Sequence, residues 1–357
     1  MLAFIKETQD VWQRLQTSVR PIVLYGMGNG ADKIIDWCEA HNVSLAGVFA
    51  SDEFVRGQMF RGHKVETYAA IKERLNDFLI VIAFASESPL VLDRFKELSR
   101  LHETVAPHLP LFPGDEIVTW DWLQRHEQKL LRVYEALADD WSRKVFAAAL
   151  NYKLSGKLHY LWESETERLH DLQNLLKWRD DEIYADLGAY NGDTIAEFLK
   201  LTRGKYHSIA AVEPDRRNFK KLAAYAEQSG LHDLQLFERA VWKEVTELDF
   251  SDSGGRQSTL LSEPKRIVQT IDIDTLLDGQ QASYIKMDVE GAELEALQGG
   301  RQQIKVNKPK LFLAAYHHDA DLFLLPLFLW QMVPEYKIYL RKHPYVPAWE
   351  LNFIVTL

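Results

Sequence analysis

The segment YADLGAYNGDT, residues 184–194, constrains the fold most, because an acid and two glycines separate an apolar run from a helical pattern. Glycines at such a place permit a tight turn and let the backbone approach a ligand closely. Asp186, Gly188 and Gly192 therefore predict a ligand-binding turn at the end of a buried strand. A similar outline occurs in IVLYGMGNGAD, residues 22–32. The sequence thus contains two candidate nucleotide-binding turns.

Composition narrows the classes of protein and partner. A chain of 357 residues favours two domains, and its net charge of −10, without a basic block, argues against a nucleic-acid partner. Cys38 is the single cysteine, which excludes an internal disulfide and fits a reducing cytoplasm. The first residues turn charged too early for a signal peptide, and the longest apolar run, 322–330, is too short to span a membrane.

The apolar patterning predicts an α/β protein in three parts. Strand-like runs at 22–25, 44–50 and 78–84 alternate with helical patterns, which favours a parallel sheet. Prolines crowd the stretch 107–113, and helical apolar stripes then continue to about 178. From 182 the alternation resumes, with LQLFERAV (234–241) expected as one strand and an antiparallel pair at the end. The expected parts are a Rossmann-like accessory domain at 1–115, a helical connector at 116–178 and a second α/β domain at 179–357.

Glu213 strengthens the case for a ligand at the second turn. It ends the next predicted strand, 25 residues after Gly188. An acid at that place can accept hydrogen bonds from both hydroxyls of a ribose. On this geometry NAD, FAD and S-adenosylmethionine all fit, and a plain tight turn is the alternative.

A third element, IKMDVEGAELEALQGG at 285–300, concentrates charge at the end of another strand. Lys286, Asp288, Glu290 and Glu293 fall within eight residues. Charges in a strand that is buried on both faces are costly unless they are paired or functional. Asp288 lies at the carboxyl end of its strand, the edge where such sheets bind ligands. The alternative is a buried ion pair that fixes the turn.

Four segments, in order, carry a family resemblance: YADLGAYNGDTIAEF, AAVEPDRRNFKKL, IKMDVEGAELEALQGG and LAAYHHDADLFLLPLFL. Together they resemble the FkbM-type S-adenosylmethionine-dependent methyltransferases over roughly 180–357, and more weakly upstream. The resemblance implies a class I methyltransferase sheet and S-adenosylmethionine as cofactor. It also implies transfer of a methyl group to a hydroxyl of a sugar, a polysaccharide precursor or a natural product.

The resemblance also implies which residues hold the cofactor. Glu213 would bind the ribose, Ala240 would lie near the adenine, and Asp288 would face the methionine end. Tyr190 departs from the broader acid-x-Gly-x-Gly-x-Gly pattern, which has glycine there. The full expected set is Asp186, Gly188, Tyr190, Asn191, Gly192, Asp193, Thr194, Glu213, Pro214, Ala240 and Asp288.

Methylation of an alcohol needs a residue that removes the hydroxyl proton. The expected catalytic residues are His317, Asp288 and Glu290, and the Tyr-His pattern of the resembling family favours His317 over His318. In the alternative, Asp319 caps the following helix and the histidines pack beside it. His317, His318, Asp319 and Asp321 could also bind Mg²⁺, but two adjacent histidines point to different sides of an extended chain, so no metal is expected. The loop SDSGGRQSTL, 251–260, is either a lid over the acceptor or a plain hairpin loop.

The first turn gives a weaker signal. Gly26, Gly28 and Ala31 fit G-x-G-x-x-G/A, but the expected acid is displaced to Asp52, 26 residues after Gly26. Two alternatives stay open: an NAD- or nucleotide-sugar-dependent enzyme that uses this turn, and a non-catalytic cofactor-binding protein. The preferred interpretation is that the turn at 184–194 carries the chemistry, with S-adenosylmethionine and a small-molecule or carbohydrate hydroxyl acceptor.

Overall fold

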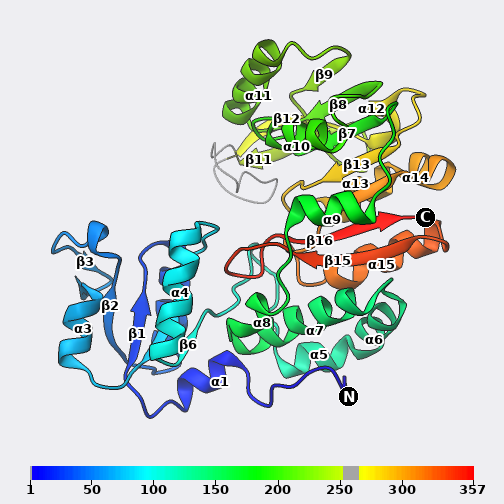
Figure 1. The fold of residues 1–357 in the computed structure, drawn as a ribbon. Helices are drawn as coiled ribbons and strands as arrows, with labels where there is room; N and C mark the ends of the chain where they lie inside the picture. Colours follow the sequence, from blue (N-terminus) through cyan, green and yellow to red (C-terminus); the bar gives the residue numbers. More distant parts are fainter. Residues whose placement is uncertain (1, 252–264) are drawn as a thin grey trace.

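The computed structural model describes residues 2–251 and 265–357. Two largely parallel sheets lie apart from each other, with a group of helices beside them (Figure 1). The predicted α/β fold class is confirmed. The predicted lid or hairpin at 251–260 lies outside the described residues, apart from Ser251.

The first sheet forms from short runs between residues 22 and 105, in the order β3-β4-β2-β1-β5-β6. The central strands β1 and β5 are buried along their whole length, as expected for a parallel sheet covered on both faces. The patterning missed β3, β4 and β6, which are short and partly polar. The strands are β1 (Ile22–Tyr25), β2 (Leu45–Phe49), β3 (Met59–Phe60), β4 (His63–Glu66), β5 (Leu79–Ile82) and β6 (Thr104–Val105). The helices are α1 (Val11–Gln16), α2 (Asn29–Ala40), the 3₁₀ turn η1 (Asp52–Phe54), α3 (Tyr68–Arg74) and α4 (Pro89–Leu101).

Helices occupy the middle of the chain. The longest, α7, begins where the Asp139 side chain accepts a hydrogen bond from the Ser142 amide, and it ends at Gly156, whose φ is +68°. Because these helices separate the two sheets, we propose the division 1–115, 116–178 and 179–357. The helices are α5 (Trp120–Arg125), α6 (Glu127–Ala136), α7 (Asp140–Ser155), α8 (His159–Trp162) and α9 (Arg168–Leu175).

The second sheet has the order β15-β16-β14-β13-β7-β8-β9. Its last strand, β16, runs antiparallel between β14 and β15, so the expected antiparallel pair at the end is present. The strands are β7 (Ile183–Leu187), β8 (Ser208–Val212), β9 (Leu234–Phe237), β13 (Tyr284–Met287), β14 (Lys310–Ala314), β15 (Lys337–Lys342) and β16 (Leu351–Thr356). The helices are α10 (Asp193–Leu201), α11 (Arg216–Ser229), α12 (Ile273–Leu277), α13 (Glu293–Gly299), α14 (Arg301–Asn307) and α15 (Asp321–Met332).

The prediction of one strand over 234–241 is wrong. β9 ends at Phe237, and Glu238 and Arg239 turn the chain out of the sheet. Ala240 and Val241 then form β10, which pairs with β12 in a separate small sheet and is buried there. The apolar pair at 240–241 thus belongs to a different sheet from the run before it. This sheet has the order β10-β12-β11, with β11 at Glu247–Ser251 and β12 at Lys265–Ile271.

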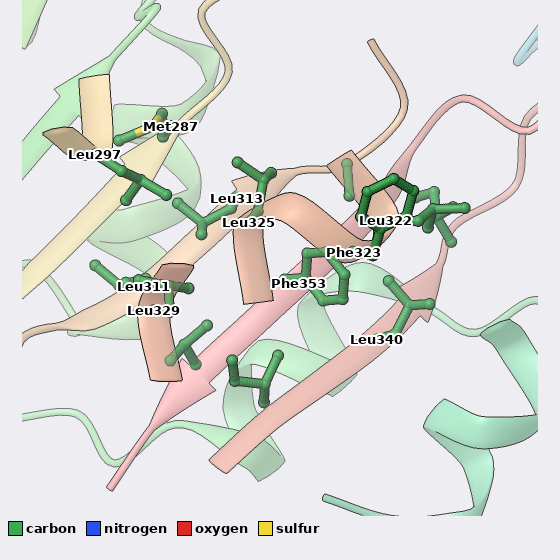
Figure 2. Close-up of a cluster of buried hydrophobic side chains, with 14 of the residues drawn as sticks. Met287, Leu297, Leu311, Leu313, Leu322, Phe323, Leu325, Leu329, Leu340 and Phe353 are labelled. Atoms are coloured by element: carbon green, nitrogen blue, oxygen red, sulfur yellow. The ribbon is translucent and has the colours of Figure 1, made fainter. Parts of the chain in front are cut away.

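The largest apolar core lies between the second sheet and helices α13 and α15 (Figure 2). Leu325 and Leu329 of α15 lie beside Leu313 and Leu311 of β14, and these four side chains are fully buried. Burial of side chains of this size contributes roughly 1.5–3 kcal/mol each. Within residues 2–251 and 265–357, none of the helices has the length and apolarity needed to cross a membrane.

The two sheets are connected by packing as well as by the chain. Tyr152 of α7, together with Val346 and Ala348 from the loop before β16, belongs to the same buried cluster as residues of the first sheet. Ser86 and Val346 exchange two backbone hydrogen bonds, of 2.8 and 3.0 Å. The loop 343–350 therefore joins the first sheet to the second.

Candidate active site

A cavity of about 1130 Å³ lies between the two sheets. Its first wall comes from the turn after β1 and from the proline-rich segment 106–113. Its second wall comes from the carboxyl ends of β7, β8, β13 and β14, and the loop 343–350, which is hydrogen-bonded to Ser86 beside the first sheet, completes the first wall. The carboxyl edge is where open α/β sheets bind ligands. The cavity therefore brings the two glycine turns to opposite sides of one space.

A buried ion pair lies beneath the second turn. Asp186 is fully buried at the end of β7, where Thr194 Oγ1 donates a 2.5 Å hydrogen bond to its Oδ2. Lys286 Nζ lies 3.5 Å from Asp186 Oδ1 and donates to the carbonyl of Gly188 at 2.6 Å. Burial raises the pKa of Asp186, although Lys286 opposes this effect. These contacts fix the strand end to the turn that follows it.

Glycine is required at two positions of this turn. Gly188 has φ +80°, and a Cβ there would lie 1.8 Å from the carbonyl oxygen of Asp288. Gly192 has φ +92°, and a Cβ there would meet the ring of Tyr225 at 2.5 Å. Tyr190, which replaces the glycine of the broader pattern, also adopts a positive φ, +49°. The position thus keeps a glycine-like backbone although its side chain differs.

Glu213 ties the turn to the next strand. It is 6% exposed, directly after β8, and its two carboxylate oxygens accept hydrogen bonds from the amides of Tyr190 at 2.9 Å and Asp215 at 2.8 Å. Burial raises the pKa of this carboxyl to about 8. The carboxyl is placed at the edge of the cavity beside the turn.

The acidic corner after β13 has an unusual backbone. Glu290 has φ +55° and Gly291 has φ +94°. Left-handed geometry in a residue other than glycine costs on the order of 1 kcal/mol, and such strain concentrates at functional sites. The Val289 amide donates to Glu293 Oε1 at 2.9 Å, which holds the corner closed. As a result Asp288 and Glu290 both line the cavity.

His317 is surrounded by these carboxylates. Its side chain is 1% exposed, with Nδ1 2.9 Å from Glu293 Oε1 and Nε2 3.3 Å from Glu290 Oε2 and 3.5 Å from Asp288 Oδ1. Burial alone would lower the pKa of His317, but Glu293 and Glu290 raise it well above its usual value. Burial alone would raise the pKa of Asp288, but Lys286 and His317 hold it below its usual value.

The neighbouring residues of the same loop turn away from this cavity. His318 Nδ1 contacts Asp115 Oδ2 at 2.8 Å, and both line a second cavity of about 530 Å³ together with Glu290. The alternative in which Asp319 caps α15 is wrong, because Ala320 is the N-cap residue. Asp319 instead accepts hydrogen bonds from buried Lys153 at 2.6 Å and His108 at 2.8 Å. These two contacts balance the buried negative charge of Asp319, which is why its side chain faces them and does not cap the helix.

Most residues of the expected site gather at the cavity, although their roles stay predictions. Asp186 lies behind the turn, Asn191 accepts from the Asp193 amide within it, and Gly192 precedes α10. The cavity is lined by Gly188, Tyr190, Asp193, Thr194, Glu213, Pro214, Ala240, Asp288, Glu290 and His317.

Sequence reasoning missed Arg168, which lines the cavity from α9. Its guanidinium pairs with Glu197 at 2.9 Å and Glu350 at 3.2 Å and lies over the ring of Phe312. No local pattern marks it, because its partners are distant in sequence. The prolines at 107–113, which predict a domain boundary, also form one wall of the cavity.

The first turn has a different character. Gly26 has φ +117°, and a Cβ there would meet the Phe84 ring at 2.5 Å, whereas a Cβ at Gly28 would point into open space. The strands around it end in Tyr25, Phe49 and Ile82. Asp52, the displaced acid of the motif, is exposed in η1.

Comparisons with known proteins agree with this geometry. Residues 186–345 match the family model described as the methyltransferase FkbM domain. The crystal structure of the methyltransferase FkbM from Methylobacillus flagellatus KT is similar to this chain, with a TM-score of 0.71 and 22% identity over 95% of this chain and 90% of that one. A putative methyltransferase from Streptococcus mutans, solved in complex with SAH, is a weaker match, with a TM-score of 0.35 and 13% identity over 53% of this chain and 97% of that one. A search of curated proteins finds no match.

The family match begins at Asp186, the buried acid of the second turn, and ends in the loop that closes the cavity. The first sheet lies outside the matched residues, although the M. flagellatus structure covers it. Residues 186–345 are therefore a methyltransferase FkbM domain, and the chain that carries them is a methyltransferase.

Proposed function

We propose that this methyltransferase uses S-adenosylmethionine and methylates a hydroxyl group of a carbohydrate or another small molecule. The observation that carries the proposal is the cavity itself. It gathers the glycine turn, Glu213 and the cluster of Asp288, Glu290 and His317 at one sheet edge. A site for S-adenosylmethionine, the methyl donor, and a set of groups that can accept a proton thus face the same cavity.

The residues of the second turn fit the cofactor. Gly188 and Gly192 leave no room for a Cβ against the Asp288 carbonyl and the Tyr225 ring, so the turn packs tightly beside the cavity, which Gly188 lines. We assign Glu213 and Pro214 to the ribose, Ala240 to the adenine and Asp288 to the methionine end. The remaining binding residues would be Asp186, Gly188, Tyr190, Asn191, Gly192, Asp193 and Thr194. When bound, S-adenosylmethionine supplies a methyl group on a positively charged sulfur.

We assign proton removal to Glu290, assisted by Asp288 and His317. The Glu290 side chain is 29% exposed and reaches the cavity, whereas the His317 ring is buried behind it. Against the effect of burial, Glu293 and Glu290 raise the pKa of His317, which favours a positive charge at this position, and such a charge would stabilise the carboxylates and the alkoxide that develops. A positioned general base contributes roughly 10²–10⁴-fold to such a reaction.

The wall opposite the second turn supports a ring-bearing acceptor. Phe84, Tyr345 and Trp349 line the cavity there. Aromatic rings provide flat apolar surface, on which the apolar face of a sugar or another ring can pack. The volume of about 1130 Å³ exceeds the usual range for a single small-molecule site, which leaves room for two reactants side by side.

The test is calorimetric titration of the full chain with S-adenosylmethionine and, separately, with NADH. A double variant, Asp186→Ala with Glu213→Ala, should lose S-adenosylmethionine binding. Asp52→Ala at the first turn is the matched control and should bind normally. NADH binding that is indifferent to the double variant would favour an NAD- or nucleotide-sugar-dependent enzyme. Donor binding without turnover on any hydroxyl acceptor would favour a non-catalytic cofactor-binding protein.

A further inference from the structure

A buried imidazole at the cavity wall has polar atoms without hydrogen bonds. Among the described residues, neither ring nitrogen of His317 has a partner with hydrogen-bond geometry, and the same holds for Glu293 Oε2. Both side chains are 1% exposed. Buried polar atoms normally find partners, because leaving one unsatisfied costs about 1–3 kcal/mol. These atoms point into a cluster of carboxylates rather than toward apolar side chains.

The spacing of the cluster fits the coordination shell of a metal ion. Asp288, Glu293 and His317 each offer one ligand atom, and these atoms lie within 4.8 Å of one another. Around an octahedral cation with bonds of about 2.1 Å, adjacent ligand atoms are about 3 Å apart and opposite ones about 4.2 Å. The contacts of His317 with Glu293, 2.9 Å, and with Asp288, 3.5 Å, are of this size.

The local charge also favours a cation. Asp288, Glu290 and Glu293 surround a single imidazole. Lys286 is directed at Gly188 and Asp186 instead. His318 is likewise directed away, at Asp115 and the carbonyl of Gly291. Three carboxylates therefore contact one ring. Tyr316 also donates to Asp288 at 3.2 Å and, against the effect of burial, Lys286 lowers the pKa of Asp288, but a divalent cation would balance the cluster better than a single proton.

We propose that Asp288, Glu293 and His317 bind one divalent cation of the Mg²⁺ and Mn²⁺ class. Two carboxylates and one imidazole suit such an ion, and Asp288 and His317 line the cavity, so its remaining positions face the space for the acceptor. There the ion would orient the acceptor oxygen, while Glu290 remains the proton acceptor. That role rests on the proposed function, whereas binding of the ion does not. These ligands differ from the set that the sequence suggests, because His318 and Asp319 contact other residues.

The experiment is titration of the metal-stripped full chain with Mn²⁺, followed by calorimetry and by the loss of the free-ion electron paramagnetic resonance signal. One saturable site per chain is expected. Glu293→Gln and Asp288→Asn keep the side-chain size and should weaken binding at least tenfold. Glu295→Gln, two residues along the same helix, is the matched control and should bind as the wild type does. Circular dichroism tests whether each variant is folded. If one of the two ligand variants does not fold, His317→Gln is used in its place.

Absence of saturable binding would overturn the inference, as would equal affinity of the wild type and Glu293→Gln. The same samples titrated with S-adenosylhomocysteine separate the two proposals. If S-adenosylhomocysteine binds but Mn²⁺ does not, the metal site is contradicted and the proposed function is not. If Mn²⁺ binds in a way that depends on Glu293 but S-adenosylhomocysteine does not bind, the metal site is supported and the proposed function is contradicted.

Discussion

The two glycine turns share a backbone plan and differ in what surrounds them. Each follows a buried central strand and opens a helix, α2 after the first turn and α10 after the second. The strands around the first turn end in Tyr25, Phe49 and Ile82. At the second, Asp186, Glu213 and Asp288 stand at or just after the strand ends. A glycine turn supplies close backbone approach in both places, and we propose that the acids at the neighbouring strand ends distinguish the turn that carries the chemistry.

The largest expected contrast comes from adding one methyl group to each turn. Gly188→Ala should abolish S-adenosylmethionine binding, more than 100-fold, and lower the free energy of unfolding by about 3 kcal/mol or more, because the Cβ would overlap the Asp288 carbonyl. Gly28→Ala meets open space, so it should cost about 1–3 kcal/mol of backbone strain and change donor affinity less than twofold. Calorimetry and denaturant unfolding measure both. Equal donor affinities would contradict the assignment of the donor to the second turn.

The next contrast removes the positively charged Lys286 side chain beneath the second turn. Lys286→Met leaves Asp186 buried without its ionic partner, so we expect a loss of about 3–5 kcal/mol in unfolding free energy. Donor affinity should fall at least tenfold, because Lys286 also holds the Gly188 carbonyl. Combining it with Asp186→Asn should recover part of the stability, since the unpaired charge is gone. A double variant no more stable than Lys286→Met would show that the pair is not coupled.

A third contrast depends on pH. The Glu213 carboxyl has an ordinary pKa of 4.5, which rises to about 8 in the folded chain. Between these values the folded state binds a proton that the unfolded state lacks, so wild-type stability falls as the pH rises from 4.5 to 8. Glu213→Gln lacks this loss and should gain up to about 4 kcal/mol relative to the wild type over that window.

Above pH 8 the same variant should bind S-adenosylmethionine more weakly, by tenfold or more, because the ionised carboxylate of the wild type accepts ribose hydrogen bonds better than a neutral amide does. Unfolding at pH 5 and pH 8 and calorimetry at pH 9 measure the two effects. A stability difference that does not change with pH would show that Glu213 titrates normally.

The smallest effect is expected at the first turn. Lys33 is exposed on α2, donates to the Pro110 carbonyl and lines the cavity. Lys33→Ala should change unfolding free energy by less than about 0.5 kcal/mol and donor affinity by less than twofold. A large loss of donor affinity would mean that the donor spans both turns.

Local patterns predicted the elements that build the site, and long-range contacts account for the rest. The strand, turn and helix around Asp186 follow from apolar runs and glycines within a dozen residues. The split between Phe237 and Ala240 depends on which sheet receives β10, which the run itself does not encode. The partners of Asp319 come from α7 and from the proline-rich segment. The capping interpretation failed because it considered the helix alone.

Arg168 illustrates the same limit of local reasoning at the cavity. Its ion-pair partners, Glu197 and Glu350, lie on two other elements, and its position over Phe312 depends on how α9 packs on the second sheet. The family resemblance predicts residues that bind S-adenosylmethionine, because each of these residues falls within a single sequence motif. The opposite wall combines 106–113 with 343–350, which no single motif contains.

The buried hydrogen bond between His108 and Asp319 joins residues 211 positions apart in the chain. At a synthesis rate of roughly 5–20 residues per second, His108 is added to the chain about 10–40 seconds before Asp319. During that interval the first sheet also lacks Val346 and Ala348, which cover part of its core. The wall of the cavity that is made first can therefore acquire its buried partners only when synthesis is nearly complete.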